Sequence, residues 1–258
     1  MDEPGNDIPA LDYEGRPLDA ANCAACAHAA LQAAGGCEIG RCCVNDIYAR
    51  RIDRFFRTHP ELANGHLDHG YFEVRAVAAR YADLFHLGAL MHDADETVRL
   101  QLALRVPQRQ LQQLRDDPHR EVRIRVAQRI ALEELAPLIR DPDYQVRAIV
   151  ARRLPEALLP LLMNDVDLQV RLVVAGRIAM PALWRLVEDQ AAEVRRIAAM
   201  RLPAPLLAAL VADPDWTVRW EVAGRAEPPL LERLRDDPEP EVRERAAAAL
   251  ASRETIDG

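Results

Sequence analysis

The chain has 258 residues, enough for one large domain or for a small module followed by a repeat array. Half of the residues are apolar and only 5% are aromatic, which is typical of helices packed through Leu, Val and Ala; the formal net charge is −8, and all 33 basic residues are Arg. We find no apolar run long enough to cross a membrane and no signal region after Met1, so we expect a cytoplasmic protein.

The first 22 residues form an acidic segment. They hold six carboxylates, scattered Pro and Gly, and a single basic residue, Arg16. Residues 1–10 are expected to have little order, because this composition buries little apolar surface, while the rest can wrap against the next module. We divide the chain into an acidic segment at 1–22, a cysteine-rich module at 23–65, repeats at 66–251 and a tail at 252–258.

All five cysteines lie in one short stretch after this segment. In a chain that we expect in the cytoplasm, such clustering indicates a metal or cluster site and argues against disulfides. Two thiolates of a Cys-x-x-Cys pair, Cys23 and Cys26, can converge on one centre. A short helix at 27–34, ended by Gly35-Gly36, would turn Cys37 back toward them.

Either Cys42 or Cys43 would complete a set of four thiolates. Four thiolates suit tetrahedral zinc or an iron–sulfur cluster, and the spacing alone slightly favours zinc. His28 is close in sequence, but four thiolates leave no position for it, so we expect it on the surface of its helix.

An amphipathic helix is predicted over residues 46–58. One face would hold the apolar residues and the other the arginines; the apolar residues are Tyr48, Ile52, Phe55 and Phe56. Pro60 would end the helix. Three histidines follow without an acidic partner in register, so we expect a solvated loop rather than a metal site; they are His59, His66 and His69.

A 24-residue repeat occupies most of the remaining chain. Its clearest mark is the dipeptide Val-Arg, which recurs eight times at a constant interval; the valines are Val74, Val98, Val122, Val146, Val170, Val194, Val218 and Val242. A fixed period over eight copies is the signature of a solenoid.

Each repeat predicts one α-helix and one shorter turn of helix. With the Val as position 0, Asp at −5 in seven copies, often followed by Pro, predicts an N-cap and a first helical residue. Ala stands at +5 in every copy, which indicates close approach of a neighbouring backbone. The helix is expected to take about 13 residues and to stop near +8. A Leu pair at +13 and +16 then predicts a 3₁₀ turn or a very short helix, and we expect no strands.

Two rows of arginine follow the same period. The row at +1 lies within the apolar sector, so each Arg is predicted to pair with the Asp of its own or the next repeat. The row at +7 lies at the edge of that sector and is expected to face solvent, where it is a candidate for binding a partner. The members of this second row are Arg105, Arg129, Arg153, Arg177, Arg201 and Arg225.

These residues resemble the leucine-rich repeat variant family. The matching pattern is Asp-Pro-x-x-x-Val-Arg with the fixed Ala, Arg and Leu pair, over roughly residues 69–251. The segments Gly36-Cys37 and Cys43-Val44, with the helix after them, resemble the iron–sulfur module that precedes the repeats in this family. The resemblance implies an all-α, right-handed superhelical solenoid of eight repeats that alternate α-helix with 3₁₀ or short helix.

The resemblance also implies a cofactor. It favours a [4Fe–4S] cluster over the alternative of zinc. The implied ligands are Cys23, Cys26, Cys37 and Cys43, with Cys42 as the alternative fourth ligand.

We interpret the chain as a non-enzymatic scaffold that binds another protein and carries a cluster with a structural, redox or iron-sensing role. An electron-transfer protein is one alternative. A solenoid that binds nucleic acid through the arginine rows is another, less favoured because the net charge is negative and no aromatic residues interleave with the row. No phosphate loop, nucleophile elbow or His-Glu-x-x-His motif indicates an enzyme, and the oligomeric state stays open.

Overall fold

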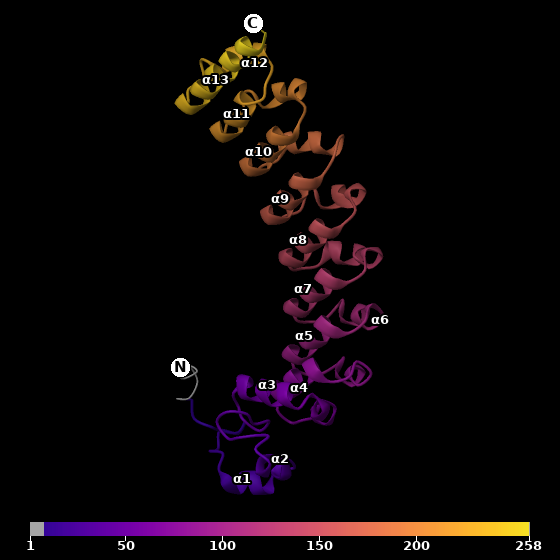
Figure 1. Cartoon of the computed structure of the whole chain (residues 1–258). Coiled ribbons are helices and arrows are strands. Elements are labelled where there is room, and N and C mark those ends of the chain that lie inside the picture. Colours follow the sequence, from indigo (N-terminus) through magenta and orange to yellow (C-terminus); the bar gives the residue numbers. More distant parts are fainter. Residues whose placement is uncertain (1–7, 258) are drawn as a thin grey trace. The chain divides into compact units, whose positions relative to one another are not determined.

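The computed structural model describes residues 8–257, which divide into two compact units at Ala131 and Leu132. Every regular element in that range is helical, as predicted (Figure 1). None of the helices described is long and apolar enough to cross a membrane. Two isolated bridges, Leu11 with Pro17 and Glu38 with Cys42, close turns in the N-terminal module.

The first unit begins with three helices of the cysteine-rich module and continues with three repeats. Its elements are α1 (Ala20–Ala25), α2 (Ala29–Ala33), α3 (Ala49–Thr58), η1 (Pro60–His66), α4 (Phe72–Tyr81), η2 (Leu87–Leu90), α5 (Glu96–Arg105), α6 (Gln108–Leu111), η3 (Gln112–Leu114) and α7 (Arg120–Arg129). The helix predicted at 46–58 is therefore α3, and it ends before Pro60 as expected.

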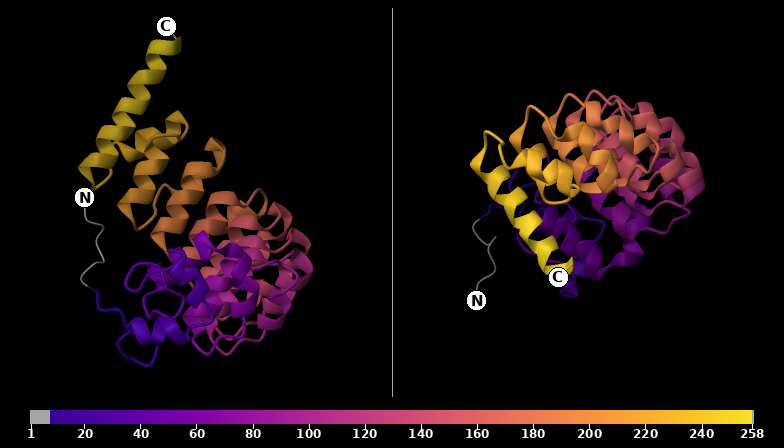
Figure 2. Two further views of the ribbon diagram at one scale, coloured as in Figure 1. Left: turned by 60° about the horizontal axis from the view of Figure 1, so that its bottom comes forward. Right: turned by 90° about the horizontal axis from the view of Figure 1, so that it is seen from above.

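The second unit continues the alternation of longer and shorter helices (Figure 2). Its elements are η4 (Leu132–Glu134), η5 (Ala136–Arg140), α8 (Tyr144–Arg153), η6 (Glu156–Leu162), α9 (Leu168–Arg177), η7 (Ala182–Glu188), α10 (Ala192–Arg201), η8 (Ala204–Leu210), α11 (Trp216–Ala223), α12 (Pro228–Leu234) and α13 (Pro240–Asp257). Because α13 runs to Asp257, the residues predicted as a tail after 251 continue the last helix.

The buried core follows the predicted positions. The Val at position 0 is fully buried in every repeat, and both members of each Leu pair are buried. The Ala at +5 is fully buried in the first seven copies, whereas Ala247 in the last copy is exposed. The pairs form the apolar side of the short helices, which confirms that a 3₁₀ turn or a short α-helix replaces a second full helix.

The predicted N-cap position is wrong by two residues. The full-length repeat helices have 10 residues, and the N-cap lies at −3, as in Asp143, whose side chain accepts the backbone N–H of Gln145 at 2.8 Å. The Asp at −5 instead accepts the N–H of the −3 residue, as Asp141 does from Asp143 at 2.8 Å. Asp-Pro therefore belongs to the turn before the helix, and the helix is shorter than the 13 residues expected.

The Asp–Arg ladder is confirmed within each unit, where it joins consecutive repeats. In six described pairs the guanidinium of the +1 Arg holds the Asp 18 residues later through Nε and Nη2; the pairs are Arg75–Asp93, Arg99–Asp117, Arg147–Asp165, Arg171–Asp189, Arg195–Asp213 and Arg219–Asp237. The Nη1 atom of the same Arg donates to backbone carbonyls before its own helix, as Arg147 does to Asp141 at 2.8 Å.

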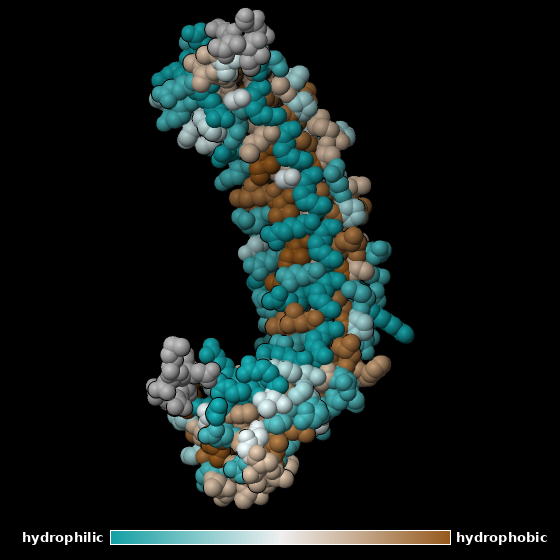
Figure 3. Space-filling model, viewed as in Figure 1, coloured by the Kyte–Doolittle hydropathy of each residue, from teal (hydrophilic) through white to brown (hydrophobic). Residues whose placement is uncertain are grey.

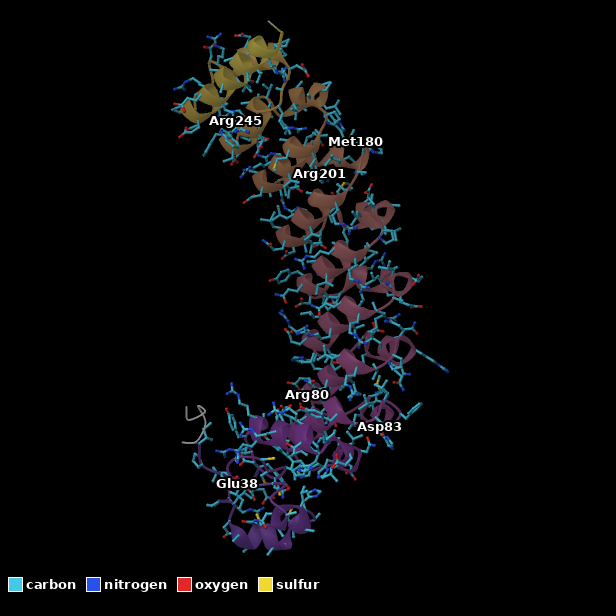
Figure 4. All side chains as sticks on the ribbon, in the orientation of Figure 1. Glu38, Arg80, Asp83, Met180, Arg201 and Arg245 are labelled. Atoms are coloured by element: carbon cyan, nitrogen blue, oxygen red, sulfur yellow. The ribbon has the colours of Figure 1, made fainter. Side chains whose placement is uncertain are left out.

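The +7 row does not face solvent as predicted. Its arginines are half-buried, and most reach back to the preceding repeat, where they donate to carbonyls at the end of the α-helix. Arg177 binds the carbonyl oxygens of Ala151 and Leu154 at 2.5 and 3.0 Å. Arg201, labelled in Figure 4, does the same to Ala175. These carbonyls lack partners within their helix, so the row caps helix ends and is not a free cationic surface.

Apolar side chains remain exposed in the second unit. On the face in Figure 3, apolar surface lies beside hydrophilic rows over α9 and α10. Leu161 is 65% exposed and Met200 is 51% exposed. Exposed apolar surface of this kind is typical of sites that contact another protein.

The ladder predicts a measurable stability loss. Arg147→Ala should lower the free energy of unfolding by about 3 kcal/mol, because it leaves the 5%-exposed carboxylate of Asp165 without its cation. The midpoint of thermal unfolding, followed by circular dichroism, should fall by several degrees. Arg140→Ala, which removes an exposed arginine of the same unit, is the control. Equal midpoints for the two variants would contradict the ladder's role.

Low pH should remove the stabilisation that the Arg147–Asp165 ion pair provides. Burial raises the pKa of Asp165, but hydrogen bonds from Arg147 and from the Asp167 N–H, with the charges of Arg147 and Arg171, hold it below its ordinary value. The ladder therefore stabilises the fold above the unfolded pKa of about 3.9 and loses that effect as pH falls through the lower folded pKa. The difference in thermal midpoint between the wild type and Arg147→Ala should shrink below pH about 4.

Capping of helix ends by the +7 row predicts a second, smaller loss of stability. Arg177→Ala should cost about 1–3 kcal/mol, because the α8 carbonyls lose a charged donor. Arg152, exposed at the neighbouring position +6 of α8, supplies the control variant Arg152→Ala. Urea unfolding followed by circular dichroism measures both. A midpoint for Arg177→Ala that matches the control would show that the capping bonds contribute nothing.

Candidate metal centre

The two short helices of the module place the first cysteines. Asp19 caps α1, accepting from the N–H groups of Ala21 and Asn22, while the Asn22 side chain accepts from the Asp19 N–H. Cys23 lies in α1 and Cys26 is its C-cap. The short helix predicted at 27–34 is α2, and Gly35 ends it with a φ of +75°, a conformation that favours glycine.

Four of the five cysteines surround one cavity. The residues around it are Leu18, Asn22, Cys23, Cys26, His28, Gln32, Cys37, Ile39, Cys43, Val44, Asn45 and Phe55. All five cysteines are free thiols. Cys42 lies outside this lining and is buried next to the charges of Arg54, Arg41 and Arg57. The four predicted ligands thus line one cavity, and Cys42, although close enough for its charge to act on Cys37, does not line it.

The cavity surrounds its sulfur atoms both with N–H donors, which favour a negative charge on sulfur, and with buried surroundings, which disfavour it. The His28 N–H and the Asn45 side-chain amide both donate to Cys26 Sγ, at 3.4 and 3.5 Å. Burial raises the pKa of Cys43 to about 11, although the Asn45 N–H opposes that effect, and burial also raises the pKa of Cys37. Binding a metal at Cys43 must therefore displace a proton, as is usual for thiolate sites.

The donor set fits an iron–sulfur cluster. Four cysteines, apolar walls and N–H groups directed at sulfur are the features that such clusters use. The four cysteines line a cavity and do not converge on one point, since within residues 8–257 no three side chains of His, Cys, Asp or Glu are grouped to hold a single metal ion.

A buried ion pair, missed by the sequence analysis, connects the last cysteines to the N-terminal segment. Asp46 is fully buried and accepts from Arg51 Nη1 at 3.0 Å and from the Tyr48 N–H at 2.9 Å, before the start of α3. Arg51 is only 3% exposed, so the expectation that all arginines of this helix lie on its polar face is wrong. The guanidinium also donates to the carbonyls of Ile8 and Pro9, whereas residues 1–7 of the segment expected to have little order lie outside the described residues.

The histidines are not solvated as predicted. They are half-buried between the cysteine loops and the first repeat. His28 Nε2 lies 3.1 Å from His66 Nε2, and the His66 ring packs against Phe55 and Phe56. His59 Nε2 contacts the Gly36 carbonyl at 2.8 Å. Burial lowers the pKa of His28, which is consistent with its position in the cavity wall.

His69 has a similar role at the start of the first repeat. It accepts the Tyr71 N–H at 3.0 Å, and burial lowers its pKa. It occupies the −5 position that Asp takes in the other repeats. The sequence contains a signal for this role, because His69 replaces the Asp of the other repeats at the point where the module meets the solenoid. An imidazole acceptor thus takes the place of a carboxylate.

Comparison with known proteins agrees with this geometry. A family described as "LRV protein FeS4 cluster" matches residues 10–65, and one described as "Leucine rich repeat variant" matches residues 144–167. An uncharacterized 27.7 kDa protein from the nifB 3′ region of Rhodobacter capsulatus is 46% identical over 97 residues, and the match spans 38% of each protein.

A solved structure gives the broader match. It is described as a leucine-rich repeat variant with a novel repetitive protein structural motif, and it shares 43% identity with this chain at a TM-score of 0.83. The alignment covers 88% of this chain and 97% of that one. With identity at this level over nearly the whole of a solved relative, the chain belongs to the leucine-rich repeat variant family and carries that family's iron–sulfur module at its N-terminus.

Proposed function

We propose that this protein is a non-enzymatic scaffold that binds a protein partner through its repeats, and that a [4Fe–4S] cluster in its N-terminal module supplies a redox or iron-sensing input. The observation that carries the proposal is the cavity lined by the four cysteines, because Phe55 and His28 in its wall also pack at the junction with the first repeat.

The cluster would be held by a fixed set of residues. Cys23, Cys26, Cys37 and Cys43 would supply the thiolates, and the donors to Cys26 would stabilise the charge on sulfur. When bound, such a cluster supplies a one-electron redox centre. The four cysteines keep partial exposure, which favours exchange of electrons with the surroundings over a purely structural role.

The cluster site is coupled to the repeats through packing. Phe55 is fully buried in α3, reaches the cavity on one side and contacts His66 of η1 on the other. Tyr81, the last residue of α4, donates to Asp53 of α3 at 3.0 Å. Loss of the cluster would remove the anchor of the α1 and α2 loops and loosen α3 against the first repeat.

The repeats support a binding role more than a catalytic one. Their Asp residues are used in turns and in the ladder, and most of their +7 arginines bind backbone carbonyls. This use weakens the alternative of nucleic-acid binding through the +7 row. The exposed apolar side chains of the second unit favour contact with a protein. Five free thiols suit a reducing compartment, so we keep the cytoplasm as the expected location.

The ligand set can be tested with two adjacent variants. Protein purified without oxygen should contain about four iron and four sulfide per chain. Cys43→Ser should lose most of this iron, whereas Cys42→Ser, which changes the neighbouring thiol outside the cavity, should retain it. Iron, sulfide and zinc assays with the visible spectrum measure the outcome. One zinc without sulfide, or equal iron loss in both variants, would refute the assignment.

Hydrogen exchange of the same proteins tests the coupling. Cys43→Ser should lose amide protection in α3 and α4 but keep it in α9 and α10, where the ladder is intact. Unchanged protection in α3 and α4 after loss of the cluster would mean that no signal passes from the module to the repeats.

A further inference from the structure

A group of arginines covers the outer side of α3 and the adjoining loop. We call it the basic face, and its members are Arg41, Arg50, Arg54, Arg57 and Arg80. Positions 50, 54 and 57 share one side of α3, opposite the buried Ile52 and Phe56. Hydrophilic side chains gather over α3 and α4 in Figure 3, and Arg80 and Glu38 are labelled in Figure 4.

Two members of the basic face add positive charge that no described residue neutralises. Among the described residues, Arg50 and Arg57 form no ion pair or hydrogen bond, and both are exposed. Arg41 pairs with Glu38 at 3.3 Å, but both side chains are more than 60% exposed, so solvent screens the pair. Arg80 lies 3.3 Å from Asp53, which Tyr81 also uses. A local excess of positive charge therefore stands on a chain whose net charge is −8.

One loop connects this face to the cysteine cavity. Arg41 is followed directly by Cys42 and by Cys43, which lines the cavity. Arg54 Nη1 donates to the Arg41 carbonyl at 3.0 Å, so α3 holds this loop in place. A molecule bound to the basic face would therefore lie against the loop that carries Cys42 and Cys43.

We propose that the basic face docks a small acidic protein that carries electrons, and that this carrier exchanges one electron with the cluster beside Cys43. The reduced carrier would lose one electron, the oxidised cluster would gain it, and no covalent bond would form or break. The redox part rests on the function proposed above, whereas the docking rests on the charges alone.

The size and surroundings of the face favour a protein over nucleic acid. Five arginines on one helix, one helix end and one loop match the small interface that is usual for transient redox encounters. Two carboxylates, Glu38 and Asp53, stand among them and would repel a continuous phosphate backbone. A patch of mixed charge with positive excess instead complements an acidic protein surface and speeds its approach.

The binding test uses the full chain purified with its cluster and an acidic flavodoxin as the probe. Titration calorimetry at ionic strengths of about 20 and 200 mM should give binding that weakens at least about tenfold with salt. Arg50→Glu and Arg57→Gln should each weaken binding by about five- to tenfold at low salt. Arg109→Glu, which reverses an exposed charge at the second position of α6 as Arg50→Glu does in α3, should stay within about twofold.

Three results would overturn the docking proposal. They are the absence of binding at low ionic strength, an equal effect of Arg109→Glu, and tighter binding of a DNA duplex that depends on Arg50 and Arg57. All three binding measurements use the same protein samples. Circular dichroism spectra of these samples establish that the variants are folded.

Stopped-flow reduction separates docking from the cluster itself. Reduction of the chain by reduced flavodoxin should slow by about five- to tenfold in Arg50→Glu, while reduction by dithionite keeps its rate. If the purified chain contained no iron and sulfide, the proposed function would be refuted. The binding titration would then test by itself whether the acidic protein docks on the basic face. If Arg50→Glu slowed reduction by flavodoxin and by dithionite equally, the substitution would act on the cluster itself, and the docking proposal would be refuted.

Discussion

The fold depends on one guanidinium per repeat. The +1 Arg uses Nε and Nη2 for the Asp of the next repeat and Nη1 for carbonyls of its own turn, as Arg195 does with Asp213 and Asp189. The planar fork of Arg fits this arrangement and the ammonium of Lys does not. Because the ladder spans 18 residues every time, one inserted residue within that span would separate donor from acceptor, which explains why the period does not vary.

The second arginine row completes this connection at the other end of the helix. A repeat helix of 10 residues leaves its last carbonyls without internal partners, and the +7 Arg of the following repeat binds them. The fully buried Ala at +5 provides the carbonyl that most of these arginines reach, as Ala175 does for Arg201. Internal use of both rows leaves other residues to bind partners. These are the apolar side chains exposed in the second unit and the basic face on α3.

The N-terminal module is held together differently, since its first two helices, α1 and α2, contain no buried residue. The buried pair of Asp46 and Arg51 fixes the start of α3 and holds residues 8 and 9. Phe55 of the same helix closes the cysteine cavity and touches the histidine cluster. One helix thus presents an apolar side to the cavity and the first repeat and a basic side to solvent, which relates the proposed cluster to the proposed docking site.

The sequence by itself determined the period, the alternation of long and short helices, the Leu pairs of the core and the clustering of thiols, because these follow from spacing along one chain. Spacing left Cys42 and Cys43 equivalent, because adjacent residues have the same reach, and only the family resemblance favoured Cys43, which lines the cavity in the structure. The sequence misplaced the N-cap because both Asp165 and Asp167 can accept backbone N–H groups, and only the pairing of Asp165 with Arg147 distinguishes them. The orientation of the +7 row and the burial of Arg51 and the histidines were decided by the tertiary structure. A polar side chain is buried where another segment offers it partners, and those partners lie 23 to 43 residues away in the chain.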